Sequence, residues 1–282
     1  MEYLTRIVAF ALEEDTALGD VTSELTVPID RTITGTLLAK GDGVISGLAV
    51  VCEVFRQLDE TVLVELLLHD GDRVARGDRI GMIAGNARSV LKGERVALNF
   101  LQRLSGVATA TARYVEAVAG TEARVIDTRK TTPGMRLLEK AAVRHGGGHN
   151  HRIGLGDGIL IKDNHLAAIG GPDRIATAVR AARNGAPHTL RVEVEVTSLD
   201  ELEQALAVRP DTILLDNMSL DEMREAVRRT ASRALLEASG GITLESVRAV
   251  AQTGVNLISA GALTHSSRAL DISLELDMSG ES

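Results

Sequence analysis

The residues best suited to chemistry lie between Asp127 and His165, where an acidic chain becomes locally basic and rich in glycine. This segment holds seven Lys or Arg, four Asp or Glu and four of the seven histidines, in a chain of net charge −8. Clustered cations beside flexible backbone suit a small anion with several charges. A solvated basic surface would not explain the interleaved glycines, or the apolar strand Gly158–Ile161 that leads to Lys162. We therefore expect Lys162, directly after this strand, to be held in place by a buried element.

Acidic residues end two other predicted strands. Val192–Val196 alternates valine with glutamate, so Glu193 and Glu195 share one face of a strand. We expect the valines to meet outer helices and the carboxylates to point inward as metal or sugar-hydroxyl ligands; the alternative is an exposed edge strand. Asp216 follows the apolar run Thr212–Leu215 and is expected in the layer where barrel enzymes place catalytic groups.

Glycines follow the last two predicted strands. Ser239, Gly240 and Gly241 come directly after one strand, and Gly261 follows the other. Most Gly-Gly pairs are only turns, but glycines at two equivalent positions favour a phosphate site, because backbone N–H groups can approach the ligand closely.

These groups are expected at one mouth of the fold. They comprise the cations Arg129, Lys130, Arg152 and Lys162, the acids Glu195 and Asp216, and the glycines. Carboxylates and substrate phosphates commonly share Mg²⁺. The combination therefore predicts a substrate that has several anionic groups and binds with Mg²⁺. Phosphoribosyl diphosphate is such a substrate.

A zinc hydrolase is one rival interpretation. His149 and His151 form a His-x-His pair, which His165 and His265 would complete. The pair follows three consecutive glycines, however, which is poor strand sequence.

A Schiff-base aldolase is a second rival, because Lys162 at a strand tip is where such enzymes place their amine. Nothing else in the sequence requires an amine nucleophile, and the surrounding cations favour carboxylate binding.

The elements that must position these residues fall into two regions. The first hundred or so residues predict a helix at 2–14 and strands at 34–39, 43–46, 62–68 and 79–84, with Gly/Asp turns between them. This order is typical of a small α/β sandwich. A long apolar stripe predicts a connecting helix over 94–118.

The second region alternates strand and helix. Strands are predicted at 123–126, 158–161, 190–196, 212–215, 233–237 and 256–260. Ser198 and Ser219 begin capping boxes, Thr243 is expected to cap a third helix, and Gly254 to end it. Successive βα units make a parallel sheet, and the inward glutamates favour a barrel over a doubly wound sheet.

Composition narrows the function classes. The chain has no Trp, two Tyr and three Phe, so it lacks the exposed aromatics of base-stacking platforms, and its acidity disfavours a nucleic-acid backbone binder. Its single cysteine, Cys52, excludes an internal disulfide framework. No apolar run approaches the roughly 20 residues of a membrane span, and residues 1–6 lack signal-peptide features. We expect a cytoplasmic protein with no membrane or nucleic-acid partner.

Several motifs, in order along nearly the whole chain, resemble the quinolinate phosphoribosyltransferases, also called nicotinate-nucleotide pyrophosphorylases (carboxylating). They are Gly19–Ser23, Glu94–Arg95, Asp127–Gly134, Arg144–Arg152, Ile161–His165, Val192–Val196, Leu215–Asn217, Ser239–Ile242 and Gly261–His265. The resemblance implies an N-terminal α/β sandwich (residues 1–110 with the returning segment 268–282) and a C-terminal open (β/α) barrel (residues 111–267). It also implies a homodimer or a higher homo-oligomer such as a hexamer.

The implied reaction converts quinolinate and phosphoribosyl diphosphate into nicotinate mononucleotide, diphosphate and CO₂, with Mg²⁺, in NAD biosynthesis. By resemblance, the quinolinate carboxylates are bound by Arg129, His151, Arg152 and Lys162, with Arg95 contributed by a neighbouring subunit. The resemblance assigns Lys130, Glu195 and Asp216 to the phosphoribosyl diphosphate and its metal, and Ser239, Gly240, Gly241 and Gly261 to the 5′-phosphate.

Departures from the family pattern are small. Ala238 stands where a second serine is common, and Met135 where leucine is common. The alternatives are a ModD-like protein linked to molybdenum uptake, an enzyme for nicotinate or another ring acid, and a non-catalytic protein that binds small anions. Lys162 and its neighbours distinguish the leading hypothesis from the ModD-like proteins.

Overall fold

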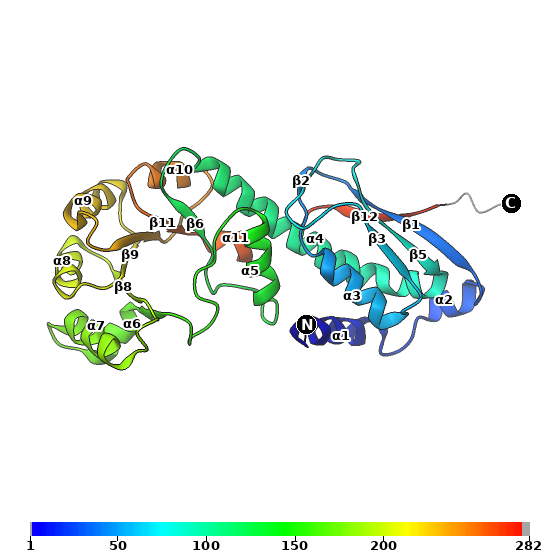
Figure 1. Ribbon diagram of the computed structural model, residues 1–282, viewed down its shortest axis with the longest axis horizontal. Coiled ribbons are helices and arrows are strands. Elements are labelled where there is room, and N and C mark those ends of the chain that lie inside the picture. Colours follow the sequence, from blue (N-terminus) through cyan, green and yellow to red (C-terminus); the bar gives the residue numbers. More distant parts are fainter. Residues whose placement is uncertain (1, 278–282) are drawn as a thin grey trace. The chain divides into compact units, whose positions relative to one another are not determined.

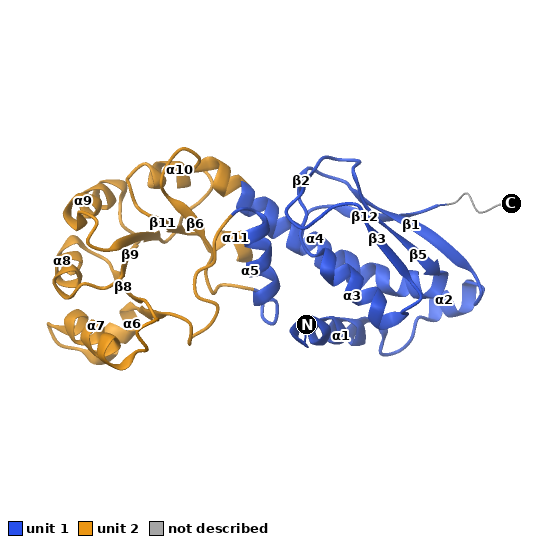
Figure 2. Ribbon diagram, viewed as in Figure 1, with its two compact units in different colours: residues 1–112, 132–147, 267–282 blue, residues 113–131, 148–266 orange. Residues whose placement is uncertain are grey.

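The computed structural model describes residues 2–277, which form two compact units (Figure 2). Unit 1 comprises residues up to 112, residues 132–147 and those from 267; unit 2 comprises 113–131 and 148–266. The predicted N-terminal domain comprised residues 1–110 and 268–282, and of these Met1 and residues 278–282 lie outside the described residues. None of the helices within residues 2–277 has the length and apolarity that crossing a bilayer requires.

Unit 1 is built on an antiparallel four-stranded sheet in the order β12-β1-β5-β3 (Figure 1). Its strands are β1 (Thr32–Ala39), β3 (Leu63–Leu66), β5 (Arg79–Asn86) and β12 (Ile272–Leu276), and a separate pair joins β2 (Gly43–Val44) to β4 (Arg73–Val74). Its helices are α1 (Glu2–Thr16), α2 (Val21–Thr26), α3 (Leu48–Leu58), the residues of α4 (Ala87–Ala117) up to Ala112, and α5 (Arg136–His145).

Helices and sheet share one core in unit 1. Helix α3 buries Val50, Val54 and Phe55 on its apolar face, and β5 contributes Ile80 and Ile83. Each of these side chains is at most 2% exposed, and burying such a side chain stabilises a fold by about 1.5–3 kcal/mol. The predicted α/β sandwich is confirmed.

Segment 132–147 belongs to unit 1, whereas the prediction assigned all of residues 111–267 to the barrel domain. Two contacts explain the difference. The buried Glu139 accepts hydrogen bonds from Arg103 on α4, and Gly146 packs so closely on α4 that a Cβ there would lie 2.3 Å from the carbonyl oxygen of Ala108. Such tertiary packing has no local signature in the sequence.

Unit 2 carries a parallel six-stranded sheet in the order β6-β11-β10-β9-β8-β7. Its strands are β6 (Arg124–Ile126), β7 (Ile159–Ile161), β8 (Val192–Val196), β9 (Thr212–Asp216), β10 (Leu235–Ser239) and β11 (Leu257–Ser259). Its helices, after the end of α4, are α6 (Asp163–Ile169), α7 (Arg174–Gly185), α8 (Leu199–Val208), α9 (Leu220–Thr230), α10 (Val247–Ala251) and α11 (Ala262–His265). All six strands predicted for this region are present.

The sheet is an open barrel. Strands β6 and β7 are consecutive in the chain but form opposite edges of the sheet, so no ladder closes it there. Side chains that follow both edge strands, Lys130 after β6 and Lys162 after β7, nevertheless line one cavity. The sheet must therefore curl, which confirms the predicted open (β/α) barrel.

Strand β8 confirms the alternating pattern. It lies between β7 and β9, and all five of its residues are buried, including Glu193 and Glu195. The alternative of an exposed edge strand is therefore wrong.

Two of the three predicted helix caps are confirmed. The side chain of Ser198 accepts from Glu201 N–H, and Ser219 forms a full capping box with Glu222. The prediction for Thr243 is wrong: a turn in which the Ser246 and Val247 N–H groups bond to the Thr243 carbonyl precedes α10, which begins only at Val247.

Candidate active site

A cavity of about 580 Å³ opens at the C-terminal ends of the unit 2 strands. It is lined by Thr128, Arg129, Lys130, His151, Arg152, Leu160, Lys162, Leu214, Asp216, Asn217, Glu237, Ser239, Gly240, Gly241 and Ser259. Every predicted site residue is among them except Arg95, Glu195 and Gly261. Parallel strands end at the same edge of a sheet, so residues far apart in sequence converge here.

Like charges meet in this cavity. Burial lowers the pKa of the Arg152 guanidinium, and the nearby positive charge of Arg129 lowers it further. The Nε of Arg129 is buried and has no hydrogen-bond partner among the described residues. The cavity therefore brings positive charges together and contains a buried N–H group without an acceptor. An anionic ligand would supply both the opposite charge and the acceptor.

Asp127 positions the loop that carries Arg152. This carboxylate is completely buried at the end of β6; Oδ1 accepts from the backbone N–H of His151 at 2.8 Å, and Oδ2 accepts from Asn150 Nδ2 at 2.7 Å. His149 forms an isolated parallel bridge with Ile126. The loop therefore lies along the edge strand where the barrel is open.

Lys162 is held by an acidic partner. Its Nζ donates to Glu195 Oε2 at 2.9 Å, and Glu195 is only 6% exposed. The backbone N–H of Lys162 donates to His165 Nδ1 at 2.9 Å, so His165 caps the start of α6. An ammonium paired with a carboxylate serves as a fixed charge, whereas Schiff-base chemistry needs a neutral amine. This arrangement favours anion binding over the aldolase alternative.

Asp216 at the end of β9 lines the cavity, and its Oδ2 accepts from Asn217 Nδ2 at 2.8 Å. Next to it, Gly240 has a positive φ of 98°, and a Cβ there would lie 2.2 Å from Asn217 Oδ1. Only glycine fits this turn, which explains why the backbone after β10 is exposed to the cavity.

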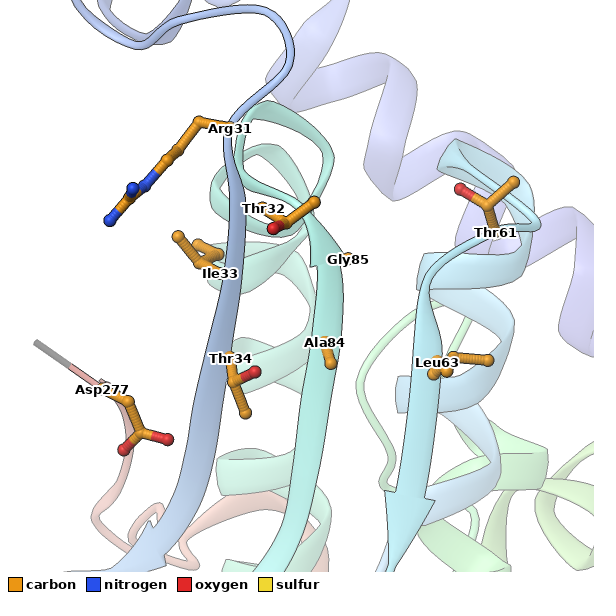
Figure 3. Close-up of a pocket in the computed structure, with 9 residues that line it drawn as sticks. All are labelled: Arg31, Thr32, Ile33, Thr34, Thr61, Leu63, Ala84, Gly85 and Asp277. Carbon is orange, nitrogen blue, oxygen red and sulfur yellow. The ribbon is translucent and has the colours of Figure 1, made fainter. Parts of the chain in front are cut away.

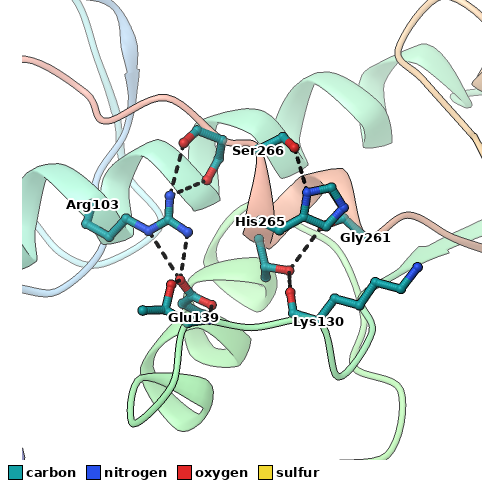
Figure 4. A network of polar contacts seen from close by, with 9 residues as sticks. Arg103, Lys130, Glu139, Gly261, His265 and Ser266 are labelled. Atoms are coloured by element: carbon teal, nitrogen blue, oxygen red, sulfur yellow. Dashed lines mark hydrogen bonds and ion pairs between the residues drawn. The ribbon is translucent and has the colours of Figure 1, made fainter.

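Gly261 does not line the cavity but lies against a residue that does. A Cβ there would lie 3.0 Å from the His265 ring and 3.2 Å from Lys130 Cδ. Thr264 Oγ1 donates to the carbonyl of Lys130 at 2.7 Å, and His265 Nδ1 contacts Ser266 Oγ (Figure 4). The segment after β11 thus holds the base of Lys130.

The histidines do not form the rival zinc site. Among residues 2–277, one group of three or more His, Cys, Asp and Glu side chains has converging ligand atoms, and it consists of His151, Glu193 and Glu237. His149, His165 and His265 do not take part. Glu237 is 1% exposed; burial raises its pKa well above the usual value, and the charge of Glu193 raises it further.

Arg95 is the one predicted site residue in unit 1. It lies on α4 and lines a pocket with Glu14, Asp15, Asn99 and Met135, among others.

Comparison with known proteins identifies the family. The family model for the quinolinate phosphoribosyl transferase C-terminal domain matches residues 107–275, and the model for the N-terminal domain of the same family matches residues 20–105. The chain belongs to the quinolinate phosphoribosyl transferase family. A probable nicotinate-nucleotide pyrophosphorylase (carboxylating) of Bacillus subtilis is 46% identical over 269 residues, covering 95% of this chain and 92% of its own length.

Further family members match most of the chain. A nicotinate-nucleotide pyrophosphorylase (carboxylating) of Mycobacterium leprae is 47% identical over 274 residues, or 94% of each chain. The solved structure of the nicotinate-nucleotide pyrophosphorylase from Francisella tularensis has a TM-score of 0.91 at 42% identity, covering 98% of this chain and 96% of its own.

In this member of the quinolinate phosphoribosyl transferase family, sequence reasoning missed several residues at the cavity. Thr128 follows β6 and Ser259 ends β11, and both bring hydroxyl groups to the cavity. Glu237 lies on β10, which β9 separates from Glu193 and Glu195 on β8. Strand β10 (Leu235–Ser239) lacks the alternation of β8, and the signal it offered was a single acid inside a mostly apolar strand.

Proposed function

We propose that this chain transfers the phosphoribosyl group of phosphoribosyl diphosphate to quinolinate, with decarboxylation, as an enzyme of NAD biosynthesis. The products are nicotinate mononucleotide, diphosphate and CO₂. One observation carries the proposal: the cations Arg129, Arg152 and Lys162 face one cavity, where Arg129 has a bare buried donor. A dianionic aromatic acid would complete this arrangement.

Quinolinate would lie with its two carboxylates against these cations. Arg129 and Arg152 suit carboxylates because a guanidinium donates two parallel hydrogen bonds, and Lys162 adds a charge held by Glu195. Leu160 and Leu214 supply apolar surface for the ring. The ring nitrogen would then be oriented toward the ribose.

Phosphoribosyl diphosphate would occupy the other half of the cavity. The backbone N–H groups of Gly240 and Gly241 and the Ser239 hydroxyl suit its 5′-phosphate. Gly261 contributes indirectly, because its lack of a side chain leaves room for Lys130. Lys130 would bind the diphosphate and offset the charge that develops as it leaves.

The residues present fit a divalent cation. The Asp216 carboxylate faces the cavity, Glu195 lies close by on Lys162, and both offer the oxygen donors that Mg²⁺ prefers. We propose that Glu195 and Asp216 hold Mg²⁺ with the substrate. When bound, the ion would neutralise diphosphate charge.

The bond changes follow from this placement. The lone pair of the ring nitrogen forms a bond to ribose C1 while the bond from C1 to the diphosphate oxygen breaks, and diphosphate leaves with that electron pair. The ring nitrogen is then positively charged. It accepts electron density as the bond to the adjacent carboxylate breaks and CO₂ leaves, and the ring carbon takes a proton from solvent. No nucleophilic side chain is needed, because positioning and charge supply the catalysis.

We also propose a homodimer in which Arg95 of one copy completes the site of the other. Support comes from its place on unit 1, where it lines a pocket with Glu14, Asp15 and Arg103, whereas the other proposed quinolinate contacts line the cavity of unit 2. The unpaired thiol of Cys52 suits a reducing cytoplasm, where we place the reaction.

The test supplies quinolinate labelled in the carboxyl group next to the ring nitrogen, with phosphoribosyl diphosphate and Mg²⁺, and measures the released CO₂. Nicotinate in place of quinolinate is the matched comparison. We expect CO₂ and nicotinate mononucleotide from quinolinate and no nucleotide from nicotinate. Product from nicotinate alone would show a different substrate, and binding without turnover would show an anion-binding protein.

A further inference from the structure

Two buried glutamates, Glu237 in the cavity wall and Glu193 next to it, have no role in the proposed reaction. Glu193 is 7% exposed and Glu237 is 1% exposed, and both point into the barrel of unit 2. When both side chains are ionised, no described N–H or O–H group donates to the Oε1 atom of either, although the Glu237 carboxyl group lies against the Glu193 carboxylate and the Ser259 hydroxyl. An unpaired buried oxygen costs about 1–3 kcal/mol, so stability alone does not explain these side chains.

Both glutamates face the ring of His151. The Nε2 atom lies 3.1 Å from Glu193 Oε2 and 3.7 Å from Glu237 Oε2. On the other side of the ring, Nδ1 accepts the backbone N–H of Arg152 at 2.6 Å. His151 is therefore held at both nitrogens by its own unit.

These contacts fix where the proton of the ring lies. Because Nδ1 accepts a hydrogen bond, it must present its lone pair, so in the neutral ring the proton is on Nε2. That N–H points to Glu193 and has no capacity left for a substrate carboxylate. This is a different role from the quinolinate contact predicted for His151.

The same tautomer argues against a metal at this cluster. A histidine that binds a metal through Nε2 donates a proton from Nδ1 to an acceptor. Here Nδ1 faces a donor, Arg152 N–H, so Nε2 has no lone pair to give. The convergence of His151, Glu193 and Glu237 is better suited to holding a ring.

We propose that Glu193, with Glu237 beside it, is a positioning residue: it fixes the His151 ring, which in turn holds the backbone of Arg152 so that the guanidinium faces the cavity. The Arg152 guanidinium is also held by a hydrogen bond of its own, which Nη1 donates to the carbonyl of Gly158 at 3.3 Å. The inference rests on the proposed function, in which Arg152 binds quinolinate.

The test compares two variants at one position. Glu193→Gln keeps an oxygen that accepts the His151 N–H, while Glu193→Met keeps the shape and removes the acceptor. We expect the methionine variant to raise the KM for quinolinate about fivefold, as expected for loss of one hydrogen bond, and the glutamine variant to restore it. The KM for phosphoribosyl diphosphate should stay within about twofold in both, because only the Arg152 side of the cavity changes.

Thermal unfolding separates positioning from a structural role. In Glu193→Met, removal of an incompletely paired buried carboxylate offsets the loss of the acceptor for His151, so the unfolding midpoint should stay close to that of the wild type. Glu203→Gln, on the exposed face of α8, is the matched control and should behave as the wild type. A methionine variant with a lower midpoint and equal losses for both substrates would overturn the proposal in favour of a structural role.

Nitrogen NMR of ¹⁵N-histidine-labelled wild-type protein tests the ring directly and does not depend on any variant folding. We expect the His151 signals of an Nε2–H ring; a proton on Nδ1 would overturn the proposal. The wild-type CO₂ assay is done first. If it fails, the proposed function is wrong; if it succeeds and the Glu193 variants behave alike, only the positioning role is wrong.

Discussion

Both units bury a fully paired carboxylate, Glu139 in unit 1 and Asp127 in unit 2, but unit 2 also buries two glutamates that are not fully paired. In unit 1, both Glu139 oxygens are satisfied: Oε1 accepts from Arg103 and from the Thr132 hydroxyl, and Oε2 accepts from the Thr132 N–H (Figure 4). In unit 2, Glu193 and Glu237, when both are ionised, each keep one buried oxygen to which no described group donates. A fully paired buried charge holds structure together, whereas an incompletely paired one reduces stability and is kept for another reason.

The sheet of each unit borders a pocket, and the two pockets differ in how many charged side chains line them. The pocket of about 460 Å³ over β1, β5 and β3 in unit 1 is lined mostly by Thr and aliphatic side chains, with Arg31 and Asp277 as its charged residues (Figure 3). Figure 3 shows the Arg31 side chain extending away from the strands. Antiparallel strands alternate direction, so this sheet gathers no set of strand ends at one place. Parallel strands do, and the cavity of unit 2 accordingly lies where the ends of its strands meet.

The largest effect should follow from breaking the complete pair of unit 1. Arg103→Ala leaves Glu139 buried without its cation, which should lower the free energy of unfolding by about 3–5 kcal/mol. Denaturant unfolding measures it. Replacing both residues with methionine should restore most of the loss. If Arg103→Ala were as stable as the wild type, the contrast between the units would disappear.

Next in size is the loss of Lys162. Lys162→Ala removes a charge-assisted contact worth about 1.5–3 kcal/mol, so the KM for quinolinate should rise roughly tenfold or more. Lys40→Ala is the matched control, because Lys40 pairs with Glu275 in unit 1 where both side chains are partly exposed. It should leave both KM values unchanged. Equal steady-state kinetics for the two variants would remove Lys162 from the site.

Much of this contrast is readable in the sequence, where the pattern is local. Alternation along Val192–Val196 predicts inward carboxylates because strand side chains repeat every two residues, and Lys162 is predicted at a strand tip by the apolar run before it. Ser198 and Ser219 identify their helices because caps are made within one turn.

The remainder depends on contacts between distant segments. The long helix begins at Ala87, seven residues before the predicted 94, because its first turn is buried by packing that periodicity does not report. The placement of segment 132–147 in unit 1 depends on Arg103, and the meeting of Glu237 with His151 depends on strand order. Pairing of distant residues cannot be read from one chain.

A smaller effect is expected from the glycines after β10. In Gly240→Ala the new Cβ meets Asn217 at a backbone angle that strains any side chain, which costs on the order of 1–3 kcal/mol and should raise the KM for phosphoribosyl diphosphate. Gly241→Ala meets nothing within 4 Å at a milder φ of 60°, so its loss should be smaller. Initial rates at varied phosphoribosyl diphosphate test the order, and the reverse order would contradict this turn geometry.

The smallest effect is a pH dependence that belongs to unit 2. Burial, and then the charge of Glu193, raise the pKa of Glu237 above its usual 4.5. Between the usual value and the raised one, the folded state binds more protons than the unfolded state, so this group makes stability fall as pH rises through that window. Glu237→Gln removes the titrating group. Its stability relative to the wild type should therefore increase as pH rises from 5 to 8. Urea unfolding of both proteins at several pH values measures the difference. A constant difference across that range would mean that Glu237 is as well satisfied as Glu139, and that the two units treat their buried carboxylates alike.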